Sequence, residues 1–297
     1  MTWDWDVVVI GAGPAGLCAA LNLARARRQT LVLDSNRPRN AATFHSHGFL
    51  SRDGISPLEL RALGRQELEA YPEASFAKTT VTNVVREGNG FVVSSGEGEA
   101  TTRSVVITTG LTEVLPALPS IRAFYGTSIH SCVECDAYEY ADQPIALIGE
   151  TDDLAARAML LSQWSRDLIV FTNGVGTVSE AEEARLAEWG IRVERRALAD
   201  VTGNRSGLTG VVLAGGETIA RTVAFVRPIY VNSLGYAESL SLEVDADGLL
   251  TVDSGGRTSV RGVYAAGDGT PPGPHQLIIA AGDGARVAAT VNADLLE

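Results

Sequence analysis

Two cysteines separated by two residues, with an acid directly after them, are the residues of this sequence best suited to chemistry. They form the segment Cys132-Val133-Glu134-Cys135-Asp136. Thiols at this spacing can close a disulfide and carry two electrons, and the thiolate is the form that reacts. The alternative is half of a zinc site, which needs two more soft ligands at matching spacing. Because the sequence has one other cysteine, Cys18, inside an apolar segment, we favour redox chemistry.

A glycine-rich turn near the N-terminus predicts a nucleotide site. The apolar run 7–10 predicts a buried parallel strand, and it leads into Gly11-Ala12-Gly13-Pro14-Ala15-Gly16. A helix is expected over 17–27, and a second strand over 30–33 ends in Asp34. The glycines allow a tight turn, a close approach of a pyrophosphate and close packing of helix on strand. The helix start then offers free N–H groups to phosphate, and Asp34 stands where a ribose-binding carboxylate is needed.

A second part of this site is expected near the other end of the chain. Residues 263–266 predict a buried strand that closes on Gly267-Asp268. After a proline-rich loop, residues 276–281 are apolar enough for a buried helix. An acid after such a strand can accept hydrogen bonds from ribitol hydroxyls, and the helix start can face a flavin ring.

Composition excludes several classes of partner. The chain has 297 residues, enough for two domains, and Lys+Arg of 24 against Asp+Glu of 36 gives 24 − 36 = −12. This balance argues against nucleic acid or an anionic membrane surface as partner. No apolar run is long enough to cross a bilayer, and residues 1–6 carry acids where a secretory signal has basic residues. Three cysteines are too few for a disulfide scaffold, so a cytoplasmic location is expected.

Together these segments resemble the low-molecular-weight thioredoxin reductase family. The matching motifs are 11–17, Ile107-Thr108-Thr109-Gly110, 132–136 and Gly262-Val263-Tyr264-Ala265-Ala266-Gly267-Asp268, in the order and spacing of the family. The resemblance implies an α/β fold of two Rossmann-like, three-layer ββα domains, the second inserted in the first. The FAD-binding domain would comprise 1–116 and 245–297, and the inserted NAD(P)-binding-like domain, 117–244, would carry the cysteine pair. It also implies a homodimer.

The resemblance also implies roles for individual residues. Cys135 would lie near the flavin, Cys132 would attack the external substrate, and Asp136 would transfer protons. FAD would be the cofactor. The residues expected to bind it are Gly11, Gly13, Pro14, Ala15, Gly16, Asp34, Ser35, Arg39, Asn40, Val81, Thr109, Gly110, Gly267, Asp268, His275 and Gln276.

The inserted domain departs from the family at its own nucleotide fingerprint. A strand is predicted over 144–148 and a helix over 154–161, but Gly149-Glu150-Thr151-Asp152-Asp153-Leu154 stands where the family has G-x-G-x-x-A/G. Thr151 adds a side chain where backbone must meet phosphate, and Leu154 adds bulk where strand and helix must pack. Carboxylates at 152 and 153 occupy the positive end of the predicted helix and would repel phosphate.

The loop after the next predicted strand also lacks residues that a nicotinamide cofactor needs. The predicted strand 168–171 is followed by Thr172-Asn173-Gly174-Val175-Gly176-Thr177, without the Lys or Arg that an NADPH 2′-phosphate needs. Ser179 and Glu182 predict a capping box for the helix that follows. We therefore predict that the nicotinamide site is degenerate and that the domain is retained for packing.

FAD and a cysteine pair without a nicotinamide site resemble the thioredoxin reductase-like dithiol oxidases of the gliotoxin and holomycin type. The stretches 45–54 and Pro274-His275-Gln276 also resemble that branch. Their cycle implies oxidation of a small dithiol to a disulfide, with dioxygen as acceptor and hydrogen peroxide as product. The alternatives are an NAD(P)H-dependent reductase of a small thioredoxin-like protein, a flavin-bound redox sensor without turnover, and a ferredoxin-driven reductase.

The four histidines leave two interpretations open. His275 is expected to begin the helix that faces the flavin, as a proton acceptor from a thiol or as a residue that closes a loop. His130 could lower the pKa of the Cys132 thiol, although flanking a strand is the simpler interpretation. His45 and His47 are expected in a loop near the cofactor. No metal site is expected from four scattered histidines.

Overall fold

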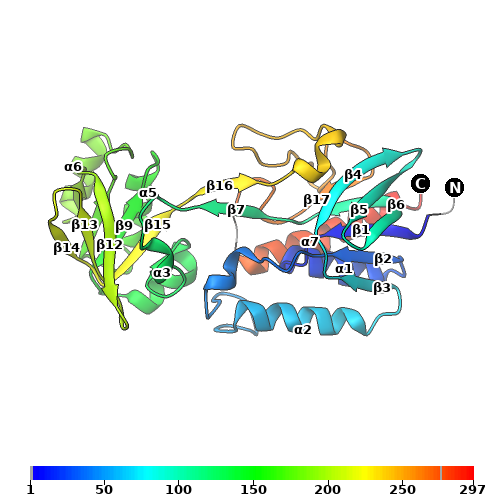
Figure 1. Ribbon diagram of the computed structural model, residues 1–297, viewed down its shortest axis with the longest axis horizontal. Helices are drawn as coiled ribbons and strands as arrows, with labels where there is room; N and C mark the ends of the chain where they lie inside the picture. The colour runs from blue at the N-terminus through cyan, green and yellow to red at the C-terminus, as the bar shows by residue number, and fades with distance from the viewer. Residues whose placement is uncertain (1–2, 275) are drawn as a thin grey trace. The chain divides into compact units, whose positions relative to one another are not determined.

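The computed structural model describes residues 3–274 and 276–297, which form two compact units (Figure 1). The first unit runs to Ala41 and includes Gly48–Thr112 and Val231–Glu297, and the second contains Ala42–His47 and Glu113–Tyr230. The expected boundaries differ from this division, because residues 231–244 cluster with the first unit. One contact that holds them there is the hydrogen bond that the Ser239 hydroxyl donates to the carbonyl of Val84, at 2.7 Å.

A seven-stranded sheet forms the centre of the first unit, in the order β3-β2-β1-β6-β5-β4, with β17 also paired to β6. The strands β1, β2, β3, β6 and β17 pair in parallel, whereas β4 and β5 pair antiparallel. Their bounds are β1 Trp5–Ile10, β2 Thr30–Leu33, β3 Ala74–Ala77, β4 Val81–Glu87, β5 Gly90–Ser95, β6 Gly98–Ile107 and β17 Val263–Ala265. Buried apolar residues on both faces explain the continuous β-branched runs of β1 and β6.

Two helices lie side by side against this sheet, α1 (Pro14–Arg25) and α7 (Leu277–Asp294) (Figure 1). Gly13 is the N-cap of α1 and Pro14 its first residue, where the missing N–H of proline costs no helix bond. The other helical segments are α2 Pro57–Glu69, η1 Arg39–Ala42 and η3 Gly235–Leu240. The turn before α1 and the loop before α7 therefore lie at the ends of two helices that pack together.

The second unit has a five-stranded parallel sheet, β11-β10-β9-β15-β8, and a three-stranded antiparallel sheet, β12-β13-β14. The strands are β8 Ile129–His130, β9 Ile145–Gly149, β10 Leu168–Phe171, β11 Arg192–Glu194, β12 Leu198–Asn204, β13 Gly207–Leu213, β14 Thr218–Ala220 and β15 Val223–Arg227. The helical segments are α3 Ile121–Phe124, α4 Val133–Asp136, η2 Ala137–Tyr140, α5 Leu154–Leu161 and α6 Glu180–Glu188. One core lies between the parallel sheet and the α5 and α6 side, and another between the two sheets.

Two short strands carry the chain at the unit boundaries. β7 (Leu111–Val114) and β16 (Ile229–Asn232) pair with each other as a two-stranded sheet. Among the described residues, no helix is both long and apolar enough to span a membrane.

The predicted α/β fold class is confirmed, and several local predictions hold to the residue. The strands at 30–33 and 168–171 and the helix at 154–161 have the expected bounds. The capping box of α6 is also present, with the Ser179 side chain accepting from the Glu182 N–H and the Glu182 side chain accepting from the Ser179 N–H. Two helices differ, because α1 begins at Pro14 and α7 continues to Asp294. Gly284 of α7 packs closely against α1, where a Cβ would collide with the Ala15 carbonyl, whereas a Cβ at Gly282 would meet no atom within 4 Å.

Candidate functional site

The turn between β1 and α1 in the first unit has the shape of a phosphate cradle. A Cβ atom at Gly11, where φ is +104°, would stand 2.5 Å from the carbonyl oxygen of Thr108, and one at Gly16 would collide with the carbonyl of Gly11. By contrast, a Cβ at Gly13 would meet no atom within 4 Å. Gly11 and Gly16 are therefore required by the fold itself, whereas Gly13 borders open space at the start of α1. That space suits a pyrophosphate on the free N–H groups of the helix.

Asp34 follows β2 and is almost completely hydrogen-bonded. Its Oδ1 accepts from the N–H of Ala12 at 3.0 Å, and its Oδ2 accepts from the N–H of Asn36 at 3.1 Å and from Nη2 of Arg61 at 2.7 Å. A carboxylate has about four acceptor positions, so one remains for a ribose hydroxyl. The Asp34 contacts thus fix the turn around the cradle and still leave room for a cofactor contact.

Arg61 is a residue that sequence reasoning missed. It projects from α2, is 4% exposed, and also donates from Nε to the carbonyl of Ala12 at 3.1 Å. Burial lowers its pKa, and the charge of Asp34 opposes that shift. No pattern in the sequence links a helical arginine to an acid 27 residues earlier, so only the packing of α2 against α1 reveals it.

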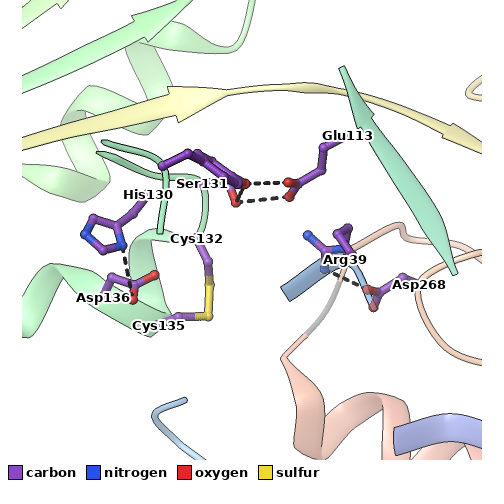
Figure 2. The surroundings of a disulfide bond; sticks show 9 residues. Arg39, Glu113, His130, Ser131, Cys132, Cys135, Asp136 and Asp268 are labelled. Atoms are coloured by element: carbon purple, nitrogen blue, oxygen red, sulfur yellow. Dashed lines mark hydrogen bonds and ion pairs between the residues drawn. A yellow bond between two sulfur atoms is a disulfide. The ribbon is translucent and has the colours of Figure 1, made fainter. Parts of the chain in front are cut away.

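The C-terminal part of the predicted cofactor site lies in the same unit. Gly267 has φ +81°, and the Asp268 carboxylate accepts from Nη2 of Arg39 at 2.7 Å (Figure 2). Gln276 is the N-cap of α7. His275, predicted as a catalytic and a cofactor-binding residue, lies outside the described residues. Arg39 was predicted as a cofactor contact, and its ion pair with Asp268 joins segments 229 residues apart.

The remaining predicted cofactor residues are spread over the same unit. The hydroxyl oxygen of Thr109 lies 3.3 Å from that of Tyr236, and Gly110 has φ +65°. The other three are the exposed Ser35 after β2, the half-buried Asn40 in η1 and the buried Val81 in β4. Thr108, which was not predicted, donates to the carbonyl of Gly11 at 2.9 Å and so ties the end of β6 to the cradle.

The cysteine pair in the second unit is closed as a disulfide between Cys132 and Cys135, with 5.3 Å between the Cα atoms (Figure 2). Cys132 is the N-cap of the short helix α4, and Cys135 and Asp136 are in the helix. The chain enters this turn from β8, which ends at His130. Because β8 is an edge strand of the parallel sheet, the turn is held at one end of a rigid element.

A network of hydrogen bonds holds the residue before Cys132. Ser131 donates to Oε1 of Glu113 at 3.2 Å (Figure 2). The Tyr125 hydroxyl donates to the Glu113 carboxylate, and its oxygen lies 2.9 Å from Ser131 Oγ. Burial raises the pKa of Tyr125, and the Glu113 carboxylate adds to the shift. The tyrosine therefore stays protonated and serves as a fixed donor. The network orients the entry to the disulfide turn.

A second group of polar side chains lies on the other side of the turn. His130 is 6% exposed, and its Nδ1 lies 3.4 Å from Oδ1 of Asp136 (Figure 2). Its Nε2 lies 3.0 Å from the hydroxyl of Tyr140, which donates to the carbonyl of Thr127 at 2.6 Å. Burial raises the pKa of Tyr140, as do the charges of Asp136 and Glu139. His130 is thus the last residue of β8, and it also contacts Asp136, the acid predicted to transfer protons.

In the second unit, residues 149–154, which differ from the family's nucleotide fingerprint, pack against other side chains of the protein. Leu154 is fully buried, and its Cδ2 lies 2.6 Å from where a Cβ of Gly149 would stand. Its Cδ1 lies 2.8 Å from the corresponding point of Gly176, in the loop after β10. The N–H of Thr177 donates to the carbonyl of Thr151 at 3.3 Å. Leu154 and this hydrogen bond join the fingerprint loop directly to the loop after β10.

Charged residues of this segment are also paired internally. Glu150 accepts from Nδ2 of Asn173 at 2.7 Å, which again bridges the two loops. Asp153 accepts from Nε of Arg227 at 2.8 Å and lies 3.4 Å from Nε of Arg157. Burial alone would raise the pKa of Asp153, but hydrogen bonds from Thr151 and Arg227 and the arginine charges hold it below its usual value. The two arginines therefore offset the repulsion of phosphate that the sequence predicted for this carboxylate.

The residues of the first unit fit FAD. The open space at Gly13, the remaining acceptor position of Asp34 and the acid at 268 match the pyrophosphate, ribose and ribitol groups of a flavin dinucleotide. Within 3–274 and 276–297, no group of three or more His, Cys, Asp or Glu side chains is arranged to hold a metal ion.

Comparison with known proteins agrees with this arrangement. The family model for pyridine nucleotide-disulphide oxidoreductase matches residues 5–284. A "Probable thioredoxin reductase" of Arthroderma benhamiae is 37% identical over 177 residues, which is 57% of this chain and 44% of the fungal protein. Among solved structures, HlmI is 38% identical with a TM-score of 0.93, and the match covers 98% of this chain and 92% of HlmI. TrxB from Bacillus anthracis is 35% identical with a TM-score of 0.93, and 98% of each chain is covered.

Proposed function

This chain belongs to the pyridine nucleotide-disulphide oxidoreductase family, and we propose that it is a dithiol oxidase that works without a nicotinamide cofactor. It is a thioredoxin reductase-like disulfide oxidoreductase with a redox-active cysteine pair, and FAD is the cofactor of the family. The proposal concerns the direction of electron flow. The cysteine pair would take electrons from a dithiol substrate, and dioxygen would be the final acceptor.

The observation that carries this proposal is the bridge between the two loops of the second fingerprint. In a functional site the adenosine ribose and pyrophosphate of the nicotinamide cofactor lie between the fingerprint turn and the loop after the next strand. Here Leu154, the Thr177–Thr151 hydrogen bond and the Glu150–Asn173 hydrogen bond join these two loops to each other. These contacts support the proposal that the chain does not use NADPH, and we derive no step through it.

Asp153 also supports the proposal that the chain does not use NADPH. The reason is its ion pairing, and not the repulsion of phosphate by its charge. Its carboxylate is held at the start of α5 by Arg227 and Arg157, so it fills the place of an anion at that helix end. The arginines that could have attracted a phosphate are already paired with it. Binding phosphate would require these ion pairs to break.

The chemistry at the cysteine pair would be two successive thiol–disulfide exchanges. One substrate thiolate attacks Cys132 Sγ, the Cys132–Cys135 bond breaks, and Cys135 leaves as a thiolate. The second substrate thiolate then attacks the sulfur bound to Cys132, which releases the substrate as a disulfide and leaves the pair as two thiols. Two protons would pass from the substrate to the enzyme, and we propose Asp136 as the acid that carries them. When bound, FAD supplies the two-electron acceptor that dioxygen can reoxidise, with hydrogen peroxide as product.

A second candidate is favoured by the names of the relatives. Proteins called thioredoxin reductase include one from Streptomyces coelicolor, 30% identical over 299 residues. An NAD(P)H-dependent reductase of a thioredoxin-like protein would require the two loops of the second fingerprint to separate. The substrate of the oxidase would be a small dithiol, and that of the reductase a small protein.

Anaerobic mixing of the purified flavoprotein with NADPH, NADH or dithiothreitol separates the two candidates. For the oxidase we expect dithiothreitol, and neither nicotinamide, to bleach the visible flavin absorbance. Admission of air should restore the colour and produce peroxide. Rapid bleaching by NADPH or NADH would overturn the proposal and support the reductase.

Two variants test the assignment of Cys132 and Cys135 as the redox-active pair, and a third serves as their control. Cys132→Ser and Cys135→Ser should both retain FAD and abolish bleaching by dithiothreitol, because neither can form the intramolecular disulfide. Cys18→Ser is the matched control, since Cys18 is a separate free thiol in α1, and it should bleach at the wild-type rate. Unchanged bleaching in Cys132→Ser would exclude electron entry through the pair.

A further inference from the structure

The side chains around His130 leave one ring nitrogen without a hydrogen-bond partner although it is buried. Nδ1 of His130 makes no hydrogen bond among the described residues, and it faces Oδ1 of Asp136 at 3.4 Å. The His130 side chain is 5% exposed and that of Asp136 15% exposed. A buried polar atom without a partner is costly, so this contact needs a physical explanation.

The hydroxyl of Tyr140 determines which ring nitrogen of His130 carries hydrogen. Tyr140 has one hydroxyl hydrogen, and the carbonyl of Thr127, 2.6 Å away, can only accept. That hydrogen is therefore used, and the Tyr140 oxygen is left as an acceptor for His130 Nε2 at 3.0 Å. Nε2 must then be the protonated nitrogen of a neutral ring. Nδ1 keeps its lone pair.

Two acceptors consequently face each other across 3.4 Å, the Nδ1 lone pair of His130 and the carboxylate of Asp136. Such a pair is unfavourable when empty and favourable when one proton lies between the two atoms. Two aromatic rings of the second unit pack against the imidazole of His130. Their centroids lie 4.9 Å (Tyr140) and 5.8 Å (Phe225) from the imidazole centroid. The imidazole therefore cannot turn away from the acid without repacking.

We propose that His130 and Asp136 share one proton between them during dithiol exchange at the adjacent disulfide, and that His130 is a positioning residue for these proton transfers. The inference rests on dithiol exchange at Cys132–Cys135, but not on dioxygen as acceptor or on the loss of the nicotinamide site. As a substrate thiol becomes the attacking thiolate, its proton goes to the empty pair. The pair returns that proton to the Cys135 thiolate released when the disulfide breaks, which restores the unprotonated pair.

Within the described part of the chain, the charged and titratable groups next to the pair include Tyr140 and Glu139, whose charge acts on Tyr140. They also include His47, whose Nε2 lies 3.5 Å from Glu139. Tyr140 has a raised pKa, so it stays protonated and keeps its bond to Thr127.

The first test uses ¹⁵N-histidine NMR of the flavoprotein, in which His130→Gln assigns one of four histidine signals. In the neutral ring we expect hydrogen on Nε2 and none on Nδ1. We also expect Asp136→Asn to change the ¹⁵N chemical shift of His130 Nδ1, since it replaces the carboxylate oxygen that faces that nitrogen. Hydrogen on Nδ1 of the neutral ring, or an Nδ1 signal unaffected by Asp136→Asn, would overturn the proposal. This test needs no turnover.

The second test measures the anaerobic rate at which dithiothreitol reduces the Cys132–Cys135 disulfide, by alkylation of the new thiols. His130→Gln should slow it about 100-fold near pH 7, at the lower end of what positioned acid–base groups contribute. The ratio of wild-type to variant rate should change with pH, and this ratio cancels the ionisation of dithiothreitol itself. Tyr140→Phe should act in the same direction, because it frees the ring tautomer.

Tyr138→Phe is the matched control for the hydroxyl, since Tyr138 lies two residues away and is 80% exposed. It should react at the wild-type rate. A ratio that does not vary with pH in His130→Gln would contradict the proton-sharing role and indicate packing alone. If wild-type protein were reduced only by NADPH and not by dithiothreitol, the proposed oxidase would fail, while the NMR result would still decide the proton pair.

Discussion

Nη2 of Arg61 lies 2.7 Å from Oδ2 of Asp34, and both side chains are nearly buried, at 4% and 10% exposed. This ion pair joins the centre of α2 to the end of β2 and, through Ala12, to the turn before α1. The acid predicted to bind ribose is therefore also part of the folded scaffold. Its two roles can be separated by changing its partner.

Arg61→Leu should lower the free energy of unfolding of the FAD-free protein by about 3–5 kcal/mol, because Asp34 would remain buried without its cation. Urea unfolding followed by circular dichroism measures this loss. Arg52→Leu is the control, since Arg52 is exposed and its guanidinium contacts the Ser51 carbonyl. Equal stabilities of the two variants would show that the Asp34 charge is satisfied without Arg61.

Gly13→Val should fold but fail to bind FAD, because its side chain would enter the open space that faces the phosphates. Gly13 has φ −72°, which valine adopts without strain. Gly16→Ala should lose both FAD and stability, since its Cβ would collide with the carbonyl of Gly11. The ratio of flavin to protein absorbance and the thermal midpoint of the FAD-free proteins distinguish the two cases. A stable, FAD-loaded Gly13→Val would place the phosphates elsewhere.

Leu154→Ala should reduce the free energy of unfolding by about 3 kcal/mol, because it leaves a cavity between β9, α5 and the loop after β10. Denaturant unfolding of the purified protein gives the value. Leu160→Ala, on the same helix at a side chain that is 40% exposed, should cost less than about 1 kcal/mol. Equal losses in the free energy of unfolding for the two variants would show that the Leu154 contacts do not stabilise the fold.

Asp153→Asn should reduce stability in a pH-dependent way. The folded pKa of Asp153 lies below its usual 3.8, so its contribution is fully present above the unfolded pKa and disappears as the pH falls through the folded value. For a partly exposed ion pair we expect about 0.5–1 kcal/mol at pH 6 and no difference at the acid limit. Urea midpoints across this range measure it, with the exposed Asp152→Asn as control. A difference that persisted in acid would point to packing.

Elements that depend on residues close together in the sequence were predicted correctly, whereas contacts between distant segments were not. Strands 30–33 and 168–171, helix 154–161 and the Ser179–Glu182 capping box depend on residues close in sequence, and their predicted bounds match the structure. The start of α1 was missed by three residues, because the G-x-G-x-x-G pattern marks the turn and the first helical turn together. Arg61 and Thr108 were missed because their partners come from other elements of the sheet and helices.

His130 shows why residue type and spacing were insufficient at the cysteine pair. From sequence it was a histidine two positions before Cys132, with a plausible role as a flanking residue. Its contact with Asp136 requires the chain to turn through α4, and its contact with Tyr140 requires the following turn η2 to bring that hydroxyl back. Neither contact has a periodicity that a pattern can reveal.

The sequence by itself determined the chemistry available to this protein: a redox-active CxxC pair with an adjacent acid, one intact nucleotide fingerprint and one departing from it. Those properties depend on residue identity within a few positions, which local sterics and backbone geometry translate into turns and helix ends. Only the tertiary structure decided that Leu154 and Asn173 bridge the departing fingerprint and that His130 faces Asp136. These contacts arise when the β-sheet sets distant segments at fixed distances, and the packed core then allows one arrangement of their side chains.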